Sequence, residues 1–101
     1  MALRSVAVVL QDPVAVFEFG VLSEVFGIDR TDDGVPPFDF RVCTEFPGMP
    51  LRGDGGVVLT APLGLEATTD VDLVAIPASD AAYAPSEAVK QVVRDAVERG
   101  A

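Results

Sequence analysis

The feature that most constrains this chain is the run at residues 6–10 (VAVVL), in which apolar side chains do not alternate with polar ones. A strand with one solvated face alternates, so an unbroken β-branched run predicts a strand buried on both faces. Residues 71–77 (VDLVAIP) form a second run of this kind. Strands of this type with helices between them predict an α/β fold, a three-layer α/β/α sandwich with a mostly parallel sheet.

The other elements follow from periodicity and from turn residues. A helix is expected at 14–26, with Asp12 as N-cap, Pro13 in the first turn and Gly27 at its end. A second helix is expected at 85–99, capped by Gly100, with one apolar stripe made of Val89, Val92, Val93, Ala96 and Val97. The remaining patterns predict a half-buried strand near a sheet edge at 38–46, a loop at 47–56, a short strand at 57–61 and a helical turn at 63–68.

The first helix differs from the second because it is apolar nearly all round. A helix that covers a sheet needs one apolar stripe, so the extra apolar face predicts a second partner, either more of its own fold or another subunit. Periodicity does not decide which side chains face outward. The candidate dimer-interface residues are Phe17, Val21, Leu22, Val25 and Phe26.

The bulk numbers set limits on the class of protein. A chain of 101 residues makes one domain with a modest core. Its net charge is −9 and its seven basic residues are scattered, so we expect no nucleic-acid binding by this chain. It has no histidine and a single cysteine, which predicts no cofactor or metal and fits a reducing cytoplasm. No apolar run is long enough to span a membrane, and no signal peptide is recognised.

Several side chains are candidates for a site. Glu18 lies between Phe17 and Phe19 in the first helix, where it is either a favourable helix-start charge or a partly buried acid with a hydrogen-bonding role. Ser79 and Asp80 follow a buried strand, where they can line a ligand crevice or cap the loop. Residues 53–56 (GDGG) precede a strand and lack a third glycine, which predicts a turn rather than a phosphate loop. Cys43 sits inside an alternating strand, which predicts a structural or surface thiol.

Four stretches together carry a family resemblance. They are VAVVL with the helix around Glu18, SEVFGIDR, FDFRVCTE with LRGDGGVVLTAPLGLE, and DLVAIPA with AVKQVVRDAVERGA. The chain resembles the N-terminal ThiJ/PfpI-like domain of AraC/XylS-type transcriptional regulators, the AdpA-like group in particular. This domain has the class I glutamine amidotransferase-like, flavodoxin-like fold. EVFGIDR is the most specific part, and the resemblance covers nearly the whole chain.

The resemblance implies a ligand site and a homodimer. In this fold the acid at the position of Glu18 points toward a cysteine, or its substitute, on a sharp strand-to-helix elbow, and the helix around it commonly packs against its copy. The expected ligand-binding residues are Glu18, Gln11, Asp12, Ala78 and Ser79. They would bind a small-molecule effector.

Two departures from the family weigh against catalysis. Enzyme relatives usually carry Pro-Gly where this chain has Pro77-Ala78, and the elbow is not in this sequence. We therefore expect residues 1–101 to be the first half of the domain, with an elbow strand inserting between the two buried strands and two helix-turn-helix units further downstream. The resemblance implies a non-catalytic ligand-sensing and dimerisation domain of a DNA-binding regulator. The alternatives are a fragment of a cysteine-dependent hydrolase, amidase or hydratase of the same superfamily and a free-standing interaction module.

Overall fold

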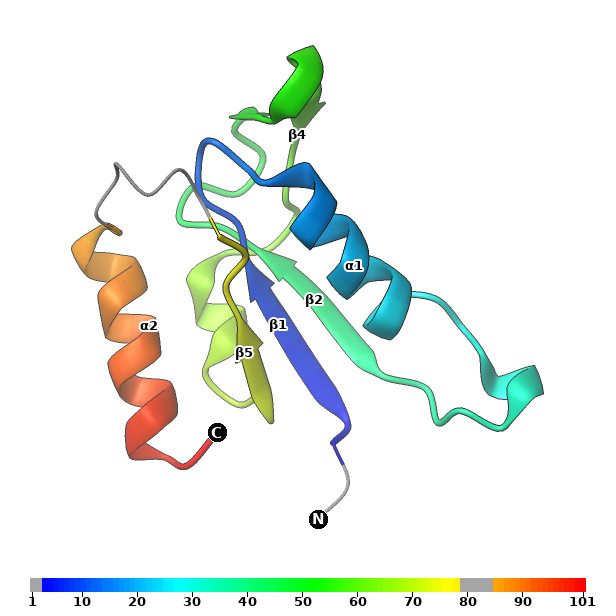
Figure 1. The fold of residues 1–101 in the computed structure, drawn as a ribbon. Helices are drawn as coiled ribbons and strands as arrows, with labels where there is room; N and C mark the ends of the chain where they lie inside the picture. The colour runs from blue at the N-terminus through cyan, green and yellow to red at the C-terminus, as the bar shows by residue number, and fades with distance from the viewer. Residues whose placement is uncertain (1–2, 79–84) are drawn as a thin grey trace.

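The computed structural model describes residues 3–78 and 85–101 and has an α/β fold, as expected (Figure 1). Three parallel strands form the sheet in the order β2–β1–β5. The sheet strands are β1 (Ser5–Val9), β2 (Asp39–Cys43) and β5 (Leu73–Ala75), and the helices are α1 (Val16–Phe26) and α2 (Glu87–Glu98). An antiparallel pair, β3 (Leu51–Arg52) and β4 (Val58–Leu59), and three short 3₁₀ helices, η1 (Thr31–Asp33), η2 (Asp54–Gly56) and η3 (Leu65–Thr68), complete the described elements.

Strand β1 occupies the centre of the sheet, and its burial on both faces is confirmed. Val6, Ala7, Val8 and Val9 are all completely buried. Because side chains alternate along a strand, the two faces meet different layers. Val8 and Leu10 belong to the cluster against which α1 packs, whereas Ala7 and Val9 face η3 and α2. Figure 1 shows α1 and α2 on opposite sides of the sheet.

Helix α1 begins at Val16, two residues later than expected, and the predicted N-cap is wrong. The N-cap is Ala15 and no side chain caps the helix, because Asp12 binds Arg52 instead. The helix ends at Gly27 as expected. A Cβ there would lie 3.1 Å from the Phe40 ring and 2.8 Å from the Ser23 carbonyl, so glycine permits the close approach of α1 to β2.

Strand β2 lies at the edge of the sheet, as predicted, and other segments of the chain contact this edge. The Leu63 backbone N–H donates to Val42 O (3.2 Å), and the Thr44 N–H donates to Leu63 O (2.9 Å). Nearer the start of the strand, the Arg41 guanidinium pairs with Asp39 and Asp70, each at 2.7 Å. A paired carboxyl end and a charged amino end protect this edge against further strand pairing.

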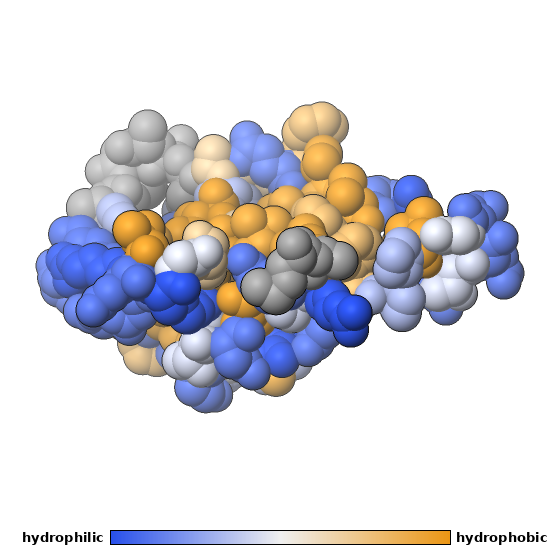
Figure 2. All heavy atoms as spheres, turned by 90° about the horizontal axis from the view of Figure 1, so that it is seen from below, coloured by the Kyte–Doolittle hydropathy of each residue, from blue (hydrophilic) through white to orange (hydrophobic). Residues whose placement is uncertain are grey.

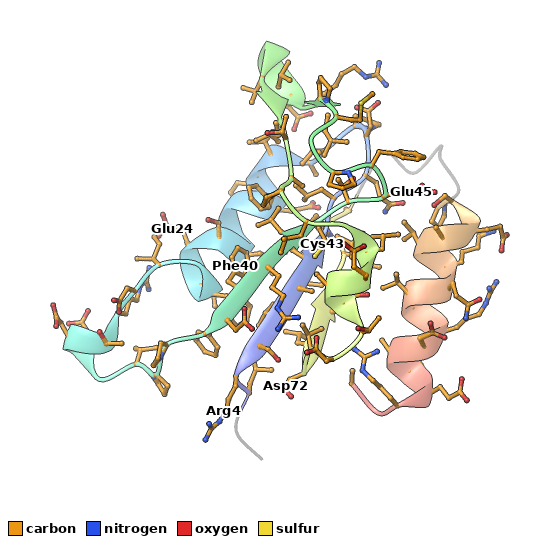
Figure 3. The ribbon with its side chains drawn as sticks, turned by 180° about the vertical axis from the view of Figure 1, so that it is seen from behind. Arg4, Glu24, Phe40, Cys43, Glu45 and Asp72 are labelled. Carbon is orange, nitrogen blue, oxygen red and sulfur yellow. The ribbon has the colours of Figure 1, made fainter. Side chains whose placement is uncertain are left out.

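Strand β5 corrects two expectations. It pairs directly with β1, Ala7 opposite Val74, so the slot expected between the two buried strands does not exist. It is also shorter than predicted and only half-buried, because in the described part of the chain β1 is its one neighbouring strand. The Asp72 carboxylate fixes the start of β5 because it accepts hydrogen bonds from the backbone N–H groups of Arg4 (2.9 Å) and Ser5 (3.1 Å). Figure 3 shows Asp72 and Arg4 together at that end of the sheet.

Helix α2 is the most regular element. The Ser86 hydroxyl accepts the backbone N–H of Val89 at 3.3 Å, an N-cap interaction that starts the helix. Only part of its apolar stripe is covered by the sheet: Val89, Val92 and Ala96 are buried, but Val93 is 40% and Val97 73% exposed. Gly100 follows the C-cap in the left-handed conformation (φ +82°).

The predictions for the 47–68 segment were mixed. β4 and the helical turn η3 are confirmed, and the glycines of GDGG form a turn with positive φ at Gly55 and Gly56. The loop prediction for 47–56 is wrong at Leu51–Arg52, which pairs as β3 with β4. The Val14 N–H donates to Arg52 O (2.7 Å), so this small hairpin is held to the chain just before α1.

None of the helices within residues 3–78 and 85–101 has the length and hydrophobicity needed to cross a bilayer. The cytoplasmic location inferred from cysteine usage stays a prediction.

Candidate functional site

The candidate site lies at the carboxyl ends of β1 and β5, where open α/β sheets form their ligand crevices. Gln11 lies two residues after the end of β1, and Ile76 directly follows β5. Together with the start of α2 they line a pocket of about 320 Å³. The lining residues are Gln11, Ile76, Pro85, Val89, Lys90, Val93 and Arg94.

The pocket is mainly apolar, with one neutral polar group and two cationic side chains. Val89 forms part of its buried wall, and Gln11 contributes a carboxamide that can donate and accept hydrogen bonds. Lys90 and Arg94 approach Glu87 at 3.3 and 3.7 Å, so their charges are partly balanced at the rim while their alkyl stems line the pocket. An apolar wall with a few polar groups is typical of sites for small molecules.

Of the predicted ligand-binding residues, the structure brings two together. Gln11 and Ala78 line the same crevice, with Leu10 and Pro77, but this crevice is too narrow to hold a ligand. Gln11 also reaches the larger pocket beside it. Ser79 and Asp80 lie outside the described residues.

Glu18 does not have the surroundings that the sequence suggested. The expectation of a partly buried acid is wrong, because Glu18 is exposed in the first turn of α1. Its neighbour Phe17 is also 80% exposed, so the flanking rings do not enclose it. Within the described residues its carboxylate makes no hydrogen bond or ion pair. The geometry matches a helix-start charge, and a ligand contact by Glu18 stays a prediction.

Asp12 serves as a structural anchor. Its carboxylate accepts the Arg52 backbone N–H at 2.7 Å and pairs with the Arg52 guanidinium at 3.2 Å. These contacts hold the pKa of Asp12 below its usual range, and the hydrogen bond from the Arg52 side chain has the largest effect. A ligand at Asp12 would have to compete with Arg52, so the carboxylate is already engaged in tying the hairpin to the loop after β1.

Cys43 is a structural thiol. It is completely buried at the end of β2, and Figure 3 places it between the sheet and η3. Burial raises the pKa of the Cys43 thiol to about 11. A neutral, enclosed thiol is a poor nucleophile at physiological pH.

The apolar residues of α1 divide into two sets. Phe19 and Leu22 pack against the core, and the Phe26 ring meets Phe38 edge-on with ring centres 5.2 Å apart. Phe17, Val21 and Val25 point outward at a spacing of four residues, with exposures of 80, 46 and 50%. These three, named here the α1 stripe, are the candidate interface residues that the structure leaves exposed, whereas Leu22 and Phe26 face inward. In Figure 2, an apolar band crosses the molecule between polar α2 and the polar segment around η1.

Sequence reasoning missed most of the pocket residues. Ile76, Val93 and Arg94 were assigned to a buried strand and to a surface helix. One signal in the sequence could have found them. The apolar stripe of α2 has five residues, but the three-stranded sheet buries only three of them, so the other two are left to line a pocket.

No family model matches this chain, and no curated protein matches it. The resemblance to the sensor domain of AraC-type regulators therefore stays a prediction, and the fold and the pocket have to support any function by themselves.

The environment of Cys43 predicts its reactivity. In the native chain we expect maleimide or iodoacetamide to label the thiol on the order of 100-fold more slowly at pH 8 than in the unfolded chain, from the thiolate fraction alone. Because the pKa of Cys43 is raised, its labelling rate in the native chain should still increase between pH 9 and 10. The labelling rate of an ordinary thiol, with a pKa of about 8.5, is nearly constant over that range. The measurement is a labelling time course read by mass spectrometry, with denatured protein as control. Equal rates in the two states would contradict the buried position of Cys43.

Proposed function

We propose that this chain is a non-catalytic ligand-sensing and dimerisation domain of a DNA-binding transcriptional regulator of the AraC/XylS type. The observation that carries the proposal is the pocket at the carboxyl ends of β1 and β5, which offers groups for binding rather than for bond cleavage. The effector class that suits it is a small, mostly apolar molecule with a polar group that reaches Gln11.

The second candidate is a cysteine-dependent hydrolase, amidase or hydratase of the ThiJ/PfpI superfamily. Nucleophilic catalysis needs an exposed thiolate beside a base. Cys43 is buried in a strand with a raised pKa, and the chain has no histidine to serve as base. Within residues 1–101 these features favour binding over catalysis.

The flavodoxin-like layering belongs to this proposal. A sheet of three strands with one helix on each face is the beginning of such a layered fold, and the open outer edge of β5 is where a fourth strand would add. The amidotransferase-like assignment therefore requires a longer sheet than the one described here.

The DNA-binding part of the proposal concerns sequence outside residues 1–101. The chain carries a net charge of −9, which is unsuited to phosphate contacts. The test is to read and express the complete reading frame that contains this segment, and to compare it with residues 1–101 in a DNA-binding titration over salt concentration. We expect specific, salt-sensitive binding by the longer polypeptide through a basic helix-turn-helix pair, and none by residues 1–101 at physiological salt. A complete reading frame without such a pair, or specific binding by residues 1–101, would contradict the proposal.

Self-association through the α1 stripe is the dimerisation part. Exposed apolar side chains aligned on one helix commonly mark an interface. We expect Val21→Asp to raise the dimer Kd at least about tenfold, which corresponds to about 1.4 kcal/mol, because it buries a charge in the contact.

The measurement is sedimentation equilibrium over a range of concentrations, with circular dichroism to confirm retained helix content. Val58→Asp is the matched control, since Val58 is 63% exposed and lies in β4, outside the α1 stripe. A Val21→Asp dimer as tight as that of the unaltered chain would remove α1 from the interface.

A further inference from the structure

We propose that two copies of this chain meet at Gly20 on α1, with the Phe17 ring of each copy seated in the open space over Gly20 of the other. The inference rests on the dimerisation part of the proposed function and deepens it. It names the point where the two α1 helices cross and the groups that touch there, whereas the α1 stripe defines only a surface.

Gly20 is a glycine for which the described residues give no local reason. It lies in the interior of α1 (Val16–Phe26), where glycine is less favourable than any residue except proline. A Cβ added at Gly20 would have no described atom within 4 Å. The other glycines have a positive φ (Gly34, Gly48, Gly55, Gly56 and Gly100) or a group close to the added Cβ (Gly27, Gly53 and Gly64).

An open space beside a helix backbone lets another helix come close. Packed helices lie roughly 8–10 Å apart, and the side chains at the crossing point decide where in that range they lie. Alanine would favour the helix at position 20 and would fit into the single chain without a clash. A close approach by a second helix gives glycine the physical reason that the single chain does not supply.

The group that fits this space lies on the same helix. Phe17 is 80% exposed, and residues three apart, such as Phe17 and Gly20, are neighbours on the helix surface. A projecting ring beside an open space is self-complementary, because a two-fold axis between them seats each ring over the glycine of the other copy. One pair of residues then makes two identical contacts, which favours a second copy over a partner of different sequence.

The rest of the exposed side of α1 agrees with a crossing at this place. Phe17 and Val21 lie on one row of side chains four residues apart, and Gly20 and Glu24 lie on the row beside it. The missing side chain interrupts the second row in the first half of the helix, next to Val21, which is 46% exposed. Figure 1 shows the sheet on one side of α1 and no described element on the side that faces away from it.

The charged groups around this contact are mostly balanced within each copy. Glu24 pairs with Arg30 at 3.2 Å, and Asp12 pairs with Arg52 just before the helix. Glu18 is exposed in the first turn, where the positive end of the helix dipole offsets part of the repulsion between the two carboxylates. The contact therefore places no unpaired charge over Gly20, and the apolar ring decides its strength.

The first test is Gly20→Ala, which adds one methyl group and changes no charge. At a concentration where the chain is monomeric, we expect the Tm to rise by roughly 4 °C, because alanine favours the helix. The Kd of self-association should rise at least about tenfold, because the methyl group occupies the space that the ring needs. The measurements are thermal unfolding followed by circular dichroism and sedimentation equilibrium on the 101-residue chain. A more stable monomer that associates less cannot result from damage to the fold.

The second test exchanges the ring and the space. Phe17→Ala and Gly20→Leu should each raise the Kd at least about tenfold, the first by removing the ring and the second by filling its place. The double variant should associate more tightly than either single variant, because the introduced leucine occupies the space that the ring has left. In a double-mutant cycle, we expect the coupling between the two positions to be at least about tenfold in Kd.

The results separate this contact from the proposed function. A Kd that Gly20→Ala leaves unchanged or lowers, or effects of Phe17→Ala and Gly20→Leu that simply multiply, would overturn the contact at Gly20. If Val21→Asp still weakens the dimer in that case, the dimerisation part of the proposed function stands. A chain that is monomeric at every concentration would overturn the contact and the dimerisation part together.

Discussion

The structure depends on the complete burial of β1 between two strands and two helical layers. Four residues of the strand have no exposed surface: Val6, Ala7, Val8 and Val9. One helical layer packs against each face of the strand. The backbone of β1 is paired on both sides, with β2 and with β5. A core of this size has few other large contacts, so stability rests heavily on this one strand.

The parts of the fold that were predictable from the sequence are those that local patterns determine. The uniform run at β1, the alternation of β2 and the stripe of α2 each reflect the surroundings of one element. The start of α1 was not predictable, because Asp12 has an N-cap's chemistry but bonds Arg52, forty positions away. The two-residue strand β3 leaves no periodic signal. Strand β5 reads as buried because both its faces are apolar, yet in the structure its outer side has no strand partner among the described residues.

The candidate site shows the same division. Gln11 was expected from the family resemblance, and it does reach the pocket. Glu18 was selected for its two phenylalanine neighbours, but adjacent residues on a helix point in different directions, and Phe17 faces solvent. Lys90 and Arg94 gave no signal because charged residues on a surface helix are ordinary. What a residue contacts across the fold decided each of these cases.

Strand β5 pairs directly with β1 on one side, and no described strand pairs with its other side. Amide hydrogen exchange, followed residue by residue by NMR on residues 1–101, tests this arrangement directly. The N–H groups of Leu73 and Ala75 face β1 and should be protected, whereas that of Val74 faces away from β1 and should exchange quickly. Protection of Val74 as strong as that of Leu73 and Ala75, or loss of protection at Leu73 and Ala75, would contradict this arrangement.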